Sequence, residues 1–323
     1  MHGSGAIAFP GLGIGEFFVD RVAFTVFGRE VYWYGVFIAT AFLLGVLLSL
    51  RLARENGLDQ DHIVNLVLIT TPVSIVGARA YYVLTTLDRY DSFYDMIAIW
   101  EGGIAIYGAI LAGMVCFFVY CRAKKLPFLK VLDVAAPSVI LGQGIGRWGN
   151  FVNQEAFGRV TDLPWRMELT IDGVRQAVHP TFLYESLWDV AGCALLLWIF
   201  FHRRADGQTA FSYFVWYGVG RFFIEGLRTD SLYVGPFRIS QLVSIALCAV
   251  GVVMLRRILR RPAAGAAGEA QPGEAGCVPA PEQSAAEQPP SGDEPGEAAA
   301  DAPAPGDEPG EAAACGPQEG QRP

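Results

Sequence analysis

The segment GQGIGRWGNFVNQEAFG, residues 142–158, places charged and amide side chains directly after an apolar run. Arg147 stands among glycines without a carboxylate three or four residues away, and Asn150, Asn153 and Glu155 follow it. A guanidinium that no nearby acid neutralises is suited to hold an anion, and its planar fork matches phosphate oxygens. The segment therefore predicts an anion site, with phosphate as the best candidate.

A second group of polar residues interrupts the apolar segment YGVGRFFIEGLR, residues 217–228. Tyr217, Arg221 and Glu225 are spaced four residues apart and share one helix face, and Arg228 follows Glu225 by three. Two interpretations stay open: a structural ion pair between Arg221 and Glu225, or a second cation for the anion. His179 opens the segment HPTFLYE and is a candidate for proton transfer.

The glycines at 144, 146 and 149 form a GxGxxG pattern, which in another context would indicate a dinucleotide site. That fingerprint works only between a parallel strand and a helix, where helix-terminal amides meet the pyrophosphate. Here the pattern follows a long apolar run. We expect these glycines to let the apolar helix end and to let its backbone approach a ligand closely.

The elements that position these residues are long and apolar. The chain is 52% hydrophobic and 17% charged, against about 25% charged in a typical soluble domain. A helix of about 20 apolar residues spans a bilayer. Seven such spans are predicted, at residues 32–50, 63–84, 104–121, 131–146, 182–201, 210–226 and 239–255.

The charges of the connecting segments predict how these spans are oriented. Basic residues follow spans one, three, five and seven, whereas the link at 85–103 has one arginine, Arg89, among several acids. Because basic flanks mark the cytoplasmic side, the N-terminus is expected outside and the C-terminus inside. The polar segments described above then face outward. No cleavable signal peptide is expected, because no basic stretch precedes an apolar one in the first 30 residues.

Residues 262–323 differ in composition from the rest of the chain. They hold 12 acids, one basic residue, 12 of the 19 prolines and the repeat GDEPGEAAA at 292–300 and 306–314. A segment with so few bulky apolar residues is expected to be disordered. We therefore predict an all-α, multi-pass membrane domain over residues 1–261 and a disordered acidic cytoplasmic tail over 262–323. The six cysteines form no CxxC pattern, so neither a disulfide framework nor a metal site is expected.

The combination GRWGNFVNQEAFG, HPTFLYE and YGVGRFFIEGLR resembles the bacterial prolipoprotein diacylglyceryl transferase family. WYG at 33–35, GAR at 77–79 and WEGGIAIYG at 100–108 resemble its other motifs, and the similarity runs from Phe9 to about Arg260. The resemblance implies a seven-span enzyme of the bacterial inner membrane with its active site toward the outer face. It implies transfer of the diacylglyceryl group of phosphatidylglycerol to the lipobox cysteine of preprolipoproteins, with formation of a thioether and release of glycerol 1-phosphate.

The resemblance also assigns roles to residues. It implies that Arg147 binds the lipid headgroup and that Arg221 is a second essential cation. The positions that match further family residues are Tyr34, Asn150, Glu155, Gly158, Tyr217, Glu225 and Arg228. Tyr34, Trp33 and Trp100 also fit an aromatic belt at the membrane surface, which is the more common role for such residues.

The chemistry needs no cofactor, metal or enzyme nucleophile, because the substrate supplies its own sulfur. The identity of the base stays open. Many family members have a histidine where this chain has Tyr107, and a phenol with a pKa near 10 is a poorer base at neutral pH. Glu155 and His179 are the alternatives, together with stabilisation of the thiolate by arginine. Phe182 also replaces a common glutamine.

A transporter of lipids or small solutes is the competing hypothesis, since polar groups at membrane depth also mark transport sites. It predicts internal repeats in the two halves of the chain, and the sequence shows none in residues 1–261. The expected partners are therefore phosphatidylglycerol, lipobox-containing signal peptides and the bilayer, and no nucleic acid.

Overall fold

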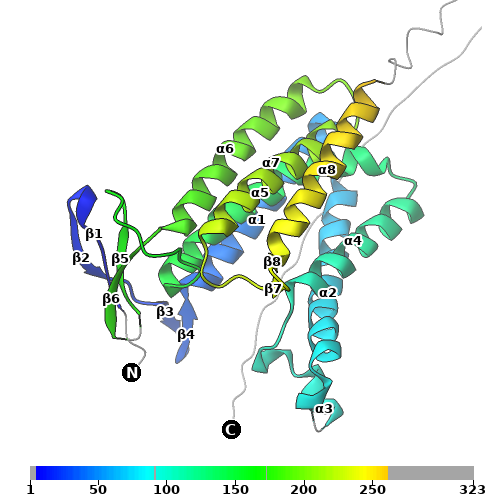
Figure 1. The fold of residues 1–323 in the computed structure, drawn as a ribbon. Coiled ribbons are helices and arrows are strands. Elements are labelled where there is room, and N and C mark those ends of the chain that lie inside the picture. Colours follow the sequence, from blue (N-terminus) through cyan, green and yellow to red (C-terminus); the bar gives the residue numbers. More distant parts are fainter. Residues whose placement is uncertain (1–4, 91, 172, 261–323) are drawn as a thin grey trace, which may run out of the picture. The chain divides into compact units, whose positions relative to one another are not determined.

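The computed structural model describes residues 5–90, 92–171 and 173–260. Its long helices form a bundle, with strands at the end where α6 begins (Figure 1). The helices are α1 (Trp33–Glu55), α2 (Gln60–Thr85), α3 (Phe93–Ile97), α4 (Ile106–Ala123), α5 (Phe128–Asn153), α6 (Thr181–His202), α7 (Gln208–Leu227) and α8 (Ile239–Leu259). The strands are β1 (Ala6–Phe9), β2 (Ile14–Phe18), β3 (Val22–Val26), β4 (Arg29–Tyr32), β5 (Met167–Ile171), β6 (Val174–Val178), β7 (Tyr233–Val234) and β8 (Phe237–Arg238).

Six helices in the described part of the chain are long and apolar enough to cross a membrane: α1, α2, α4, α5, α6 and α8. They coincide with six of the seven predicted spans. The remaining predicted span, residues 210–226, forms the 20-residue helix α7, whose composition is more polar because it carries Arg221 and Glu225. The helix packs against α5, α6 and α8, so its charged residues meet protein side chains.

The all-α expectation needs one correction, because an antiparallel sheet of four strands in the order β2-β1-β5-β6 lies beside the helices. In residues 6–18 and 167–178, apolar and polar side chains alternate over too few positions to indicate strands in a sequence dominated by apolar helices. In β5, Met167 and Leu169 are buried, and they pack with Ile7 of β1 and Phe182 at the start of α6. The sheet therefore covers the end of the bundle where α6 begins.

The glycines of residues 142–149 do not end their helix, which corrects a second expectation. Helix α5 continues to Asn153, so Arg147 and Asn150 lie on its last turns. The glycines allow neighbouring helices to approach closely. A Cβ atom on Gly149 would lie 2.6 Å from the ring of Tyr34 in α1, and one on Gly144 would lie 3.2 Å from Cβ of Asp189 in α6.

Arg79 fixes the segment that follows α2. Its guanidinium donates hydrogen bonds to the carbonyl oxygens of Asp95 (2.6 Å), Met96 (2.9 Å), Gly103 (2.8 Å) and Gly102. A buried cation that uses its donors on four carbonyl groups is committed to backbone structure. Arg79 therefore holds residues 95–103 against α2.

A reciprocal pair of tryptophans fixes α6 against α7. The indole nitrogen of Trp188 donates to the carbonyl of Trp216 (3.1 Å), and that of Trp216 donates to the carbonyl of Trp188 (3.0 Å). The rings stack with centroids 4.4 Å apart. Gly192 and Gly220 leave room for the two indoles. These two hydrogen bonds set the register of α6 relative to α7, one turn away from a group of charged side chains.

Candidate active site

Three helices contribute to one buried ion cluster, at the end of α5, the start of α6 and the end of α7. Its centre is Glu185, which is 5% exposed. One carboxylate oxygen lies 2.6 Å from Nη2 of Arg147, and the other lies 3.0 Å from Arg221 and 3.1 Å from Arg228. A single glutamate therefore joins the three arginines that the sequence singled out.

Two further carboxylates complete the pairing of these arginines. Nη2 of Arg221 lies 2.6 Å from Glu225, so the expectation that these two residues share a helix face is confirmed. Arg228 pairs with Asp230, through hydrogen bonds of 2.9 and 2.6 Å. Burial alone would raise the pKa of Asp230, but the hydrogen bonds and charge of Arg228 outweigh it and hold this pKa below its usual value.

A chain of polar contacts leads from Arg147 to the end of α5. Nη1 of Arg147 lies 3.4 Å from Oδ1 of Asn150, and the amide of Asn150 donates to Glu155 (2.8 Å). Glu155 therefore acts on Asn150 and contacts Arg147 only through it. The Nε–H of Arg147 is buried and has no acceptor among the described residues. An unsatisfied buried donor costs about 1–3 kcal/mol, which favours a ligand oxygen at this position.

Gly158 and His179 meet where the chain crosses between the sheet and the helices. The Gly158 amide donates to the His179 carbonyl (3.0 Å), and a Cβ atom on Gly158 would lie 2.6 Å from Cβ of His179. The backbone of Gly158 also forms an isolated antiparallel β-bridge with that of Arg228. Only glycine fits this junction. Nδ1 of His179 lies 3.3 Å from the hydroxyl of Tyr184, and burial lowers the pKa of the imidazole.

The three predicted tyrosines lie at different distances from the cluster. Tyr217 projects from α7 one turn before Arg221 and stacks on Tyr213, with ring centroids 5.7 Å apart. Tyr34 is 40% exposed and packs against Gly149. Tyr107 lies on α4, and no hydrogen bond to its side chain occurs among the residues that the structure describes. The structure thus brings Tyr217 to the arginines and leaves Tyr107 outside their contacts.

Sequence reasoning missed Glu185, Asp189 and Asp230. The first two are acids inside a predicted span, which is itself a signal of function. Their contacts with the cluster run between helices, so no local spacing in the sequence indicates them. Phe182, which stands where a glutamine is common, joins an aromatic cluster: its ring centroid lies 4.6 Å from that of Phe151 and 5.6 Å from that of Trp148.

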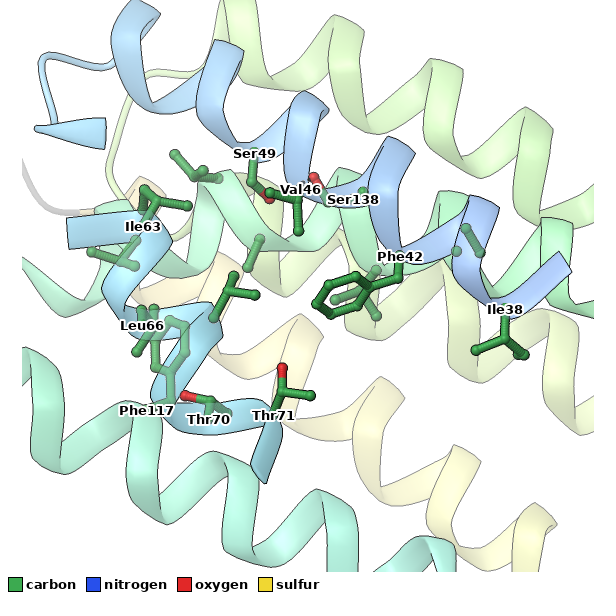
Figure 2. Close-up of a pocket in the computed structure, with 18 residues that line it drawn as sticks. Ile38, Phe42, Val46, Ser49, Ile63, Leu66, Thr70, Thr71, Phe117 and Ser138 are labelled. Carbon is green, nitrogen blue, oxygen red and sulfur yellow. Dashed lines mark hydrogen bonds between the residues drawn. The ribbon is translucent and has the colours of Figure 1, made fainter. Parts of the chain in front are cut away.

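An apolar cavity of about 390 Å³ begins five residues before Arg147 on α5. Figure 2 shows α1 residues Ile38, Phe42 and Val46 on one side and α2 residues Leu66 and Thr70 on the other. Along α5 the lining runs from Gly142 to Val131. Eleven residues of helix correspond to about 16 Å, so the cavity is long. Its lining consists almost wholly of apolar atoms.

Comparison with known proteins identifies the family of this chain. A family model described as prolipoprotein diacylglyceryl transferase matches residues 21–257. The chain belongs to the prolipoprotein diacylglyceryl transferase family. Three phosphatidylglycerol–prolipoprotein diacylglyceryl transferases illustrate the similarity. The protein of Finegoldia magna is 48% identical over 238 residues, which is 73% of this chain and 94% of that protein. Those of Pediococcus pentosaceus and Clostridioides difficile are 42% identical, covering 74% and 73% of this chain and 91% and 92% of those proteins.

The family match covers the helical bundle. The matched residues include α1 to α7, almost all of α8, and the strands β5 and β6. Strands β1 and β2 precede the match, and residues 258–323 follow it. The ion cluster and the apolar cavity both lie inside the family region. The predicted tail, residues 262–323, lies outside the described residues.

Proposed function

We propose that this transferase moves the diacylglyceryl group of phosphatidylglycerol to the thiol of a lipobox cysteine, with Arg147 and Arg221 holding the lipid phosphate. The observation that carries the proposal is the cluster itself: two arginines from different helices converge on one glutamate, and the Nε–H of Arg147 lacks an acceptor in the described chain. A phosphate oxygen would satisfy that donor. Family membership favours this transfer over the competing transporter hypothesis.

The apolar cavity supports a lipid as the donor. A phospholipid that places its phosphate at Arg147 extends its acyl chains away from the polar end of α5. The cavity begins at Gly142 and continues for about 16 Å, which suits an extended acyl chain. Gly146 precedes Arg147 on α5, and a Cβ atom at this position would lie 3.8 Å from Ile38, which lines the cavity. We assign one acyl chain of phosphatidylglycerol to this cavity.

The proposed reaction is a displacement at the glycerol carbon that carries the phosphate. The cysteine sulfur forms a bond to this carbon while the carbon–oxygen bond breaks, and the oxygen keeps the electron pair. Charge therefore grows on the leaving phosphate, and the fixed guanidinium groups of Arg147 and Arg221 stabilise it in the transition state. Asn150 and Glu155 orient Arg147, and Glu225 orients Arg221.

We also propose a membrane location and a topology for this chain. Basic residues follow the helices α1, α4, α6 and α8. They favour a cytoplasmic position for the side of the bundle on which these helices end. The ion cluster then faces the outer side of the bacterial inner membrane, with α7 as a seventh span shielded by its neighbours. This side is where the cysteine of an exported preprolipoprotein would meet the enzyme.

The test is turnover by Arg147→Ala, measured as glycerol phosphate released from phosphatidylglycerol vesicles with a lipobox peptide. We expect kcat/KM to fall by about 10²–10³, the typical effect of removing one donor to a developing anion. Arg175→Ala is the matched control, because Arg175 pairs with Glu16 and Glu168 on the exposed sheet. Near-normal turnover by Arg147→Ala would remove the phosphate role from this residue. Release without peptide would indicate a lipase.

We also propose that residues 1–261 carry the whole activity, because every residue of the site lies within them. A chain shortened after Arg261 should retain the kcat of the full chain in the same assay. Loss of activity in a shortened chain that still melts like the full chain would assign a function to residues 262–323.

A further inference from the structure

Asp189 is a buried carboxylate beside the ion cluster that the chemistry above does not use. It lies on α6 one turn after Glu185, on the same helix face, and it is 4% exposed. Its side chain packs against Gly144 of α5. No hydrogen bond or ion pair to this carboxylate occurs among the described residues, although the charges of Arg147, Glu185 and Arg221 act on it. An ionisable residue at this depth without a structural partner indicates a functional role.

The pairing of the cluster leaves Asp189 as the surplus acid. The arginines at 147, 221 and 228 are matched by the carboxylates of Glu185, Glu225 and Asp230. These three carboxylates are engaged by cations at 2.6–3.1 Å, so each is a poor proton acceptor. Glu155 accepts a hydrogen bond from Asn150. Among these acids, only Asp189 has both oxygens available for a proton.

The direction of the displacement puts the thiol near Asp189. A displacement at carbon requires the sulfur to approach opposite the leaving phosphate oxygen. With the phosphate at Arg147 and Arg221, the glycerol carbon lies on the acyl-chain side of these arginines, and the sulfur lies beyond it. Asp189 is displaced from Glu185 in that same direction, by one helical turn of about 5.4 Å. Its contact with Gly144, three residues before Arg147 on the antiparallel α5, confirms this level.

We propose that Asp189 is the catalytic residue that accepts the proton of the lipobox thiol. The S–H bond breaks as the proton moves to the Asp189 carboxylate. The sulfur then bonds to the glycerol carbon, and the carbon–oxygen bond breaks toward the phosphate. The proton passes to the leaving phosphate, which becomes a monoester monoanion, and Asp189 returns to its ionised form. This inference rests on the proposed function, and it explains how a chain with Tyr107 in place of histidine deprotonates the thiol.

The charged and titratable groups that face Asp189 are few. Arg147 faces it from α5, Glu185 precedes it on α6, and Tyr213, Tyr217 and Arg221 face it from α7. The two tyrosines are neutral at working pH, and the arginines stay charged. A pH dependence that appears only when Asp189 is changed therefore reports the loss of its carboxylate.

The experiment measures kcat for Asp189→Asn between pH 6 and 9, as glycerol phosphate released from phosphatidylglycerol vesicles with a lipobox peptide. We expect kcat at pH 7 to fall by about 10²–10⁴, the usual contribution of a positioned base. KM for the lipid should change less than about threefold, because the arginines that hold the phosphate are intact. The remaining rate should rise about tenfold per pH unit up to the thiol pKa of about 8.5, because only free thiolate then reacts. The wild-type rate should level off at a lower pH, because the Asp189 carboxylate accepts the thiol proton before free thiolate accumulates.

Two further variants keep the test decisive. Asp189→Glu retains a carboxylate and should level off at a lower pH than Asp189→Asn, at a reduced kcat, whether or not the asparagine variant folds well. Tyr107→Phe removes the alternative base and should keep the pH profile of the wild type, and Arg175→Ala on the exposed sheet is the control for rate. A wild-type profile for Asp189→Asn, an equal loss at every pH, a steep profile for Asp189→Glu or a steep profile for Tyr107→Phe would each overturn the inference. A wild-type enzyme that releases no glycerol phosphate would instead refute the proposed function.

Discussion

Replacing Glu185 by glutamine tests the central feature of the site. Glutamine keeps the volume of the side chain and one carbonyl acceptor, so the change removes charge without creating a cavity. The carboxylate lies 2.6, 3.0 and 3.1 Å from the nitrogens of three arginines. Each such pair corresponds to about 4 kcal/mol of Coulomb energy at 4 Å between charge centres and an effective dielectric constant of 20. Desolvation of the ions offsets most of this gross attraction.

The net cost follows from what remains after the substitution. Three arginines would share only Glu225 and Asp230 as paired counter-ions. Breaking a buried pair by removing one partner costs about 3–5 kcal/mol, because the other charge stays buried. For a domain of this size that corresponds to a fall in melting temperature on the order of 10 °C. We also expect kcat to fall by about 10²-fold as the arginines lose their fixed positions. KM for phosphatidylglycerol should not rise, because Glu185 no longer competes for Arg147.

The assay is thermal unfolding in detergent together with glycerol phosphate release. Glu16→Gln is the matched control: it removes the partner of Arg175 at a site where the Glu16 side chain is 51% exposed. Exposed pairs contribute about 0–1 kcal/mol, so this control should melt within a few degrees of the wild type. If Glu185→Gln melts like the control, the cluster is not held by this glutamate. A raised KM with unchanged kcat would show that Glu185 binds substrate directly.

Three other substitutions test the structural assignments around the site. Gly158→Ala places a Cβ atom 2.6 Å from Cβ of His179 and should destabilise the domain by about 1–3 kcal/mol, whereas Gly15→Ala, with no atom within 4 Å, should melt like the wild type. Arg79→Lys cannot reproduce the fork that binds the carbonyl oxygens of residues 95–103, so limited proteolysis should cut this segment faster than in the wild type, and equal rates would contradict the assignment. Asp230 has a pKa below its usual 3.8 in the folded protein, so its stabilising effect is present above the unfolded pKa and is lost as pH falls through the folded value. The melting temperature of Asp230→Asn should therefore converge on that of the wild type as pH falls from 6 to 3, and a constant difference would exclude this linkage.

The sequence predicted the helices well because each is a long apolar run, and such runs have few alternative structures in a membrane protein. All seven predicted spans correspond to helices of 18 residues or more. The predicted end of α5 was several residues too early. Glycines commonly end helices, but in α5 they allow close packing against Tyr34 and Asp189. The sheet was missed because β1 pairs with β5, which lies about 160 residues further along the chain. Local patterns carry no information on such a pairing.

The candidate site was predictable in part. Arg147 and Arg221 stood out because cations are rare in apolar segments, and the spacing of Arg221 and Glu225 is a helical neighbourhood that the sequence fixes by itself. The central glutamate of the cluster was not predictable in this way. Glu185 meets its arginines across three helices, and the register that brings them together depends on packing such as the paired indoles of Trp188 and Trp216. The partner of a buried charge is therefore the part of a site that requires the structure.

The pairing of Arg147 with Glu185 suggests how the site handles charge through a reaction cycle. A guanidinium in an apolar surrounding needs a counter-ion at every stage, and in the observed structure Glu185 supplies it. In the proposed mechanism, the phosphate of phosphatidylglycerol would replace Glu185 at Arg147 or share the arginine with it, and the Nε–H of Arg147, which Glu185 does not use, would donate to this phosphate. The phosphate gains charge as the carbon–oxygen bond breaks, so the arginines bind the transition state more strongly than the diester. The same attraction would retain the product. Because Glu185 stays within reach of all three arginines, we expect its return to Arg147 to compete with the released glycerol phosphate and so to help the product leave.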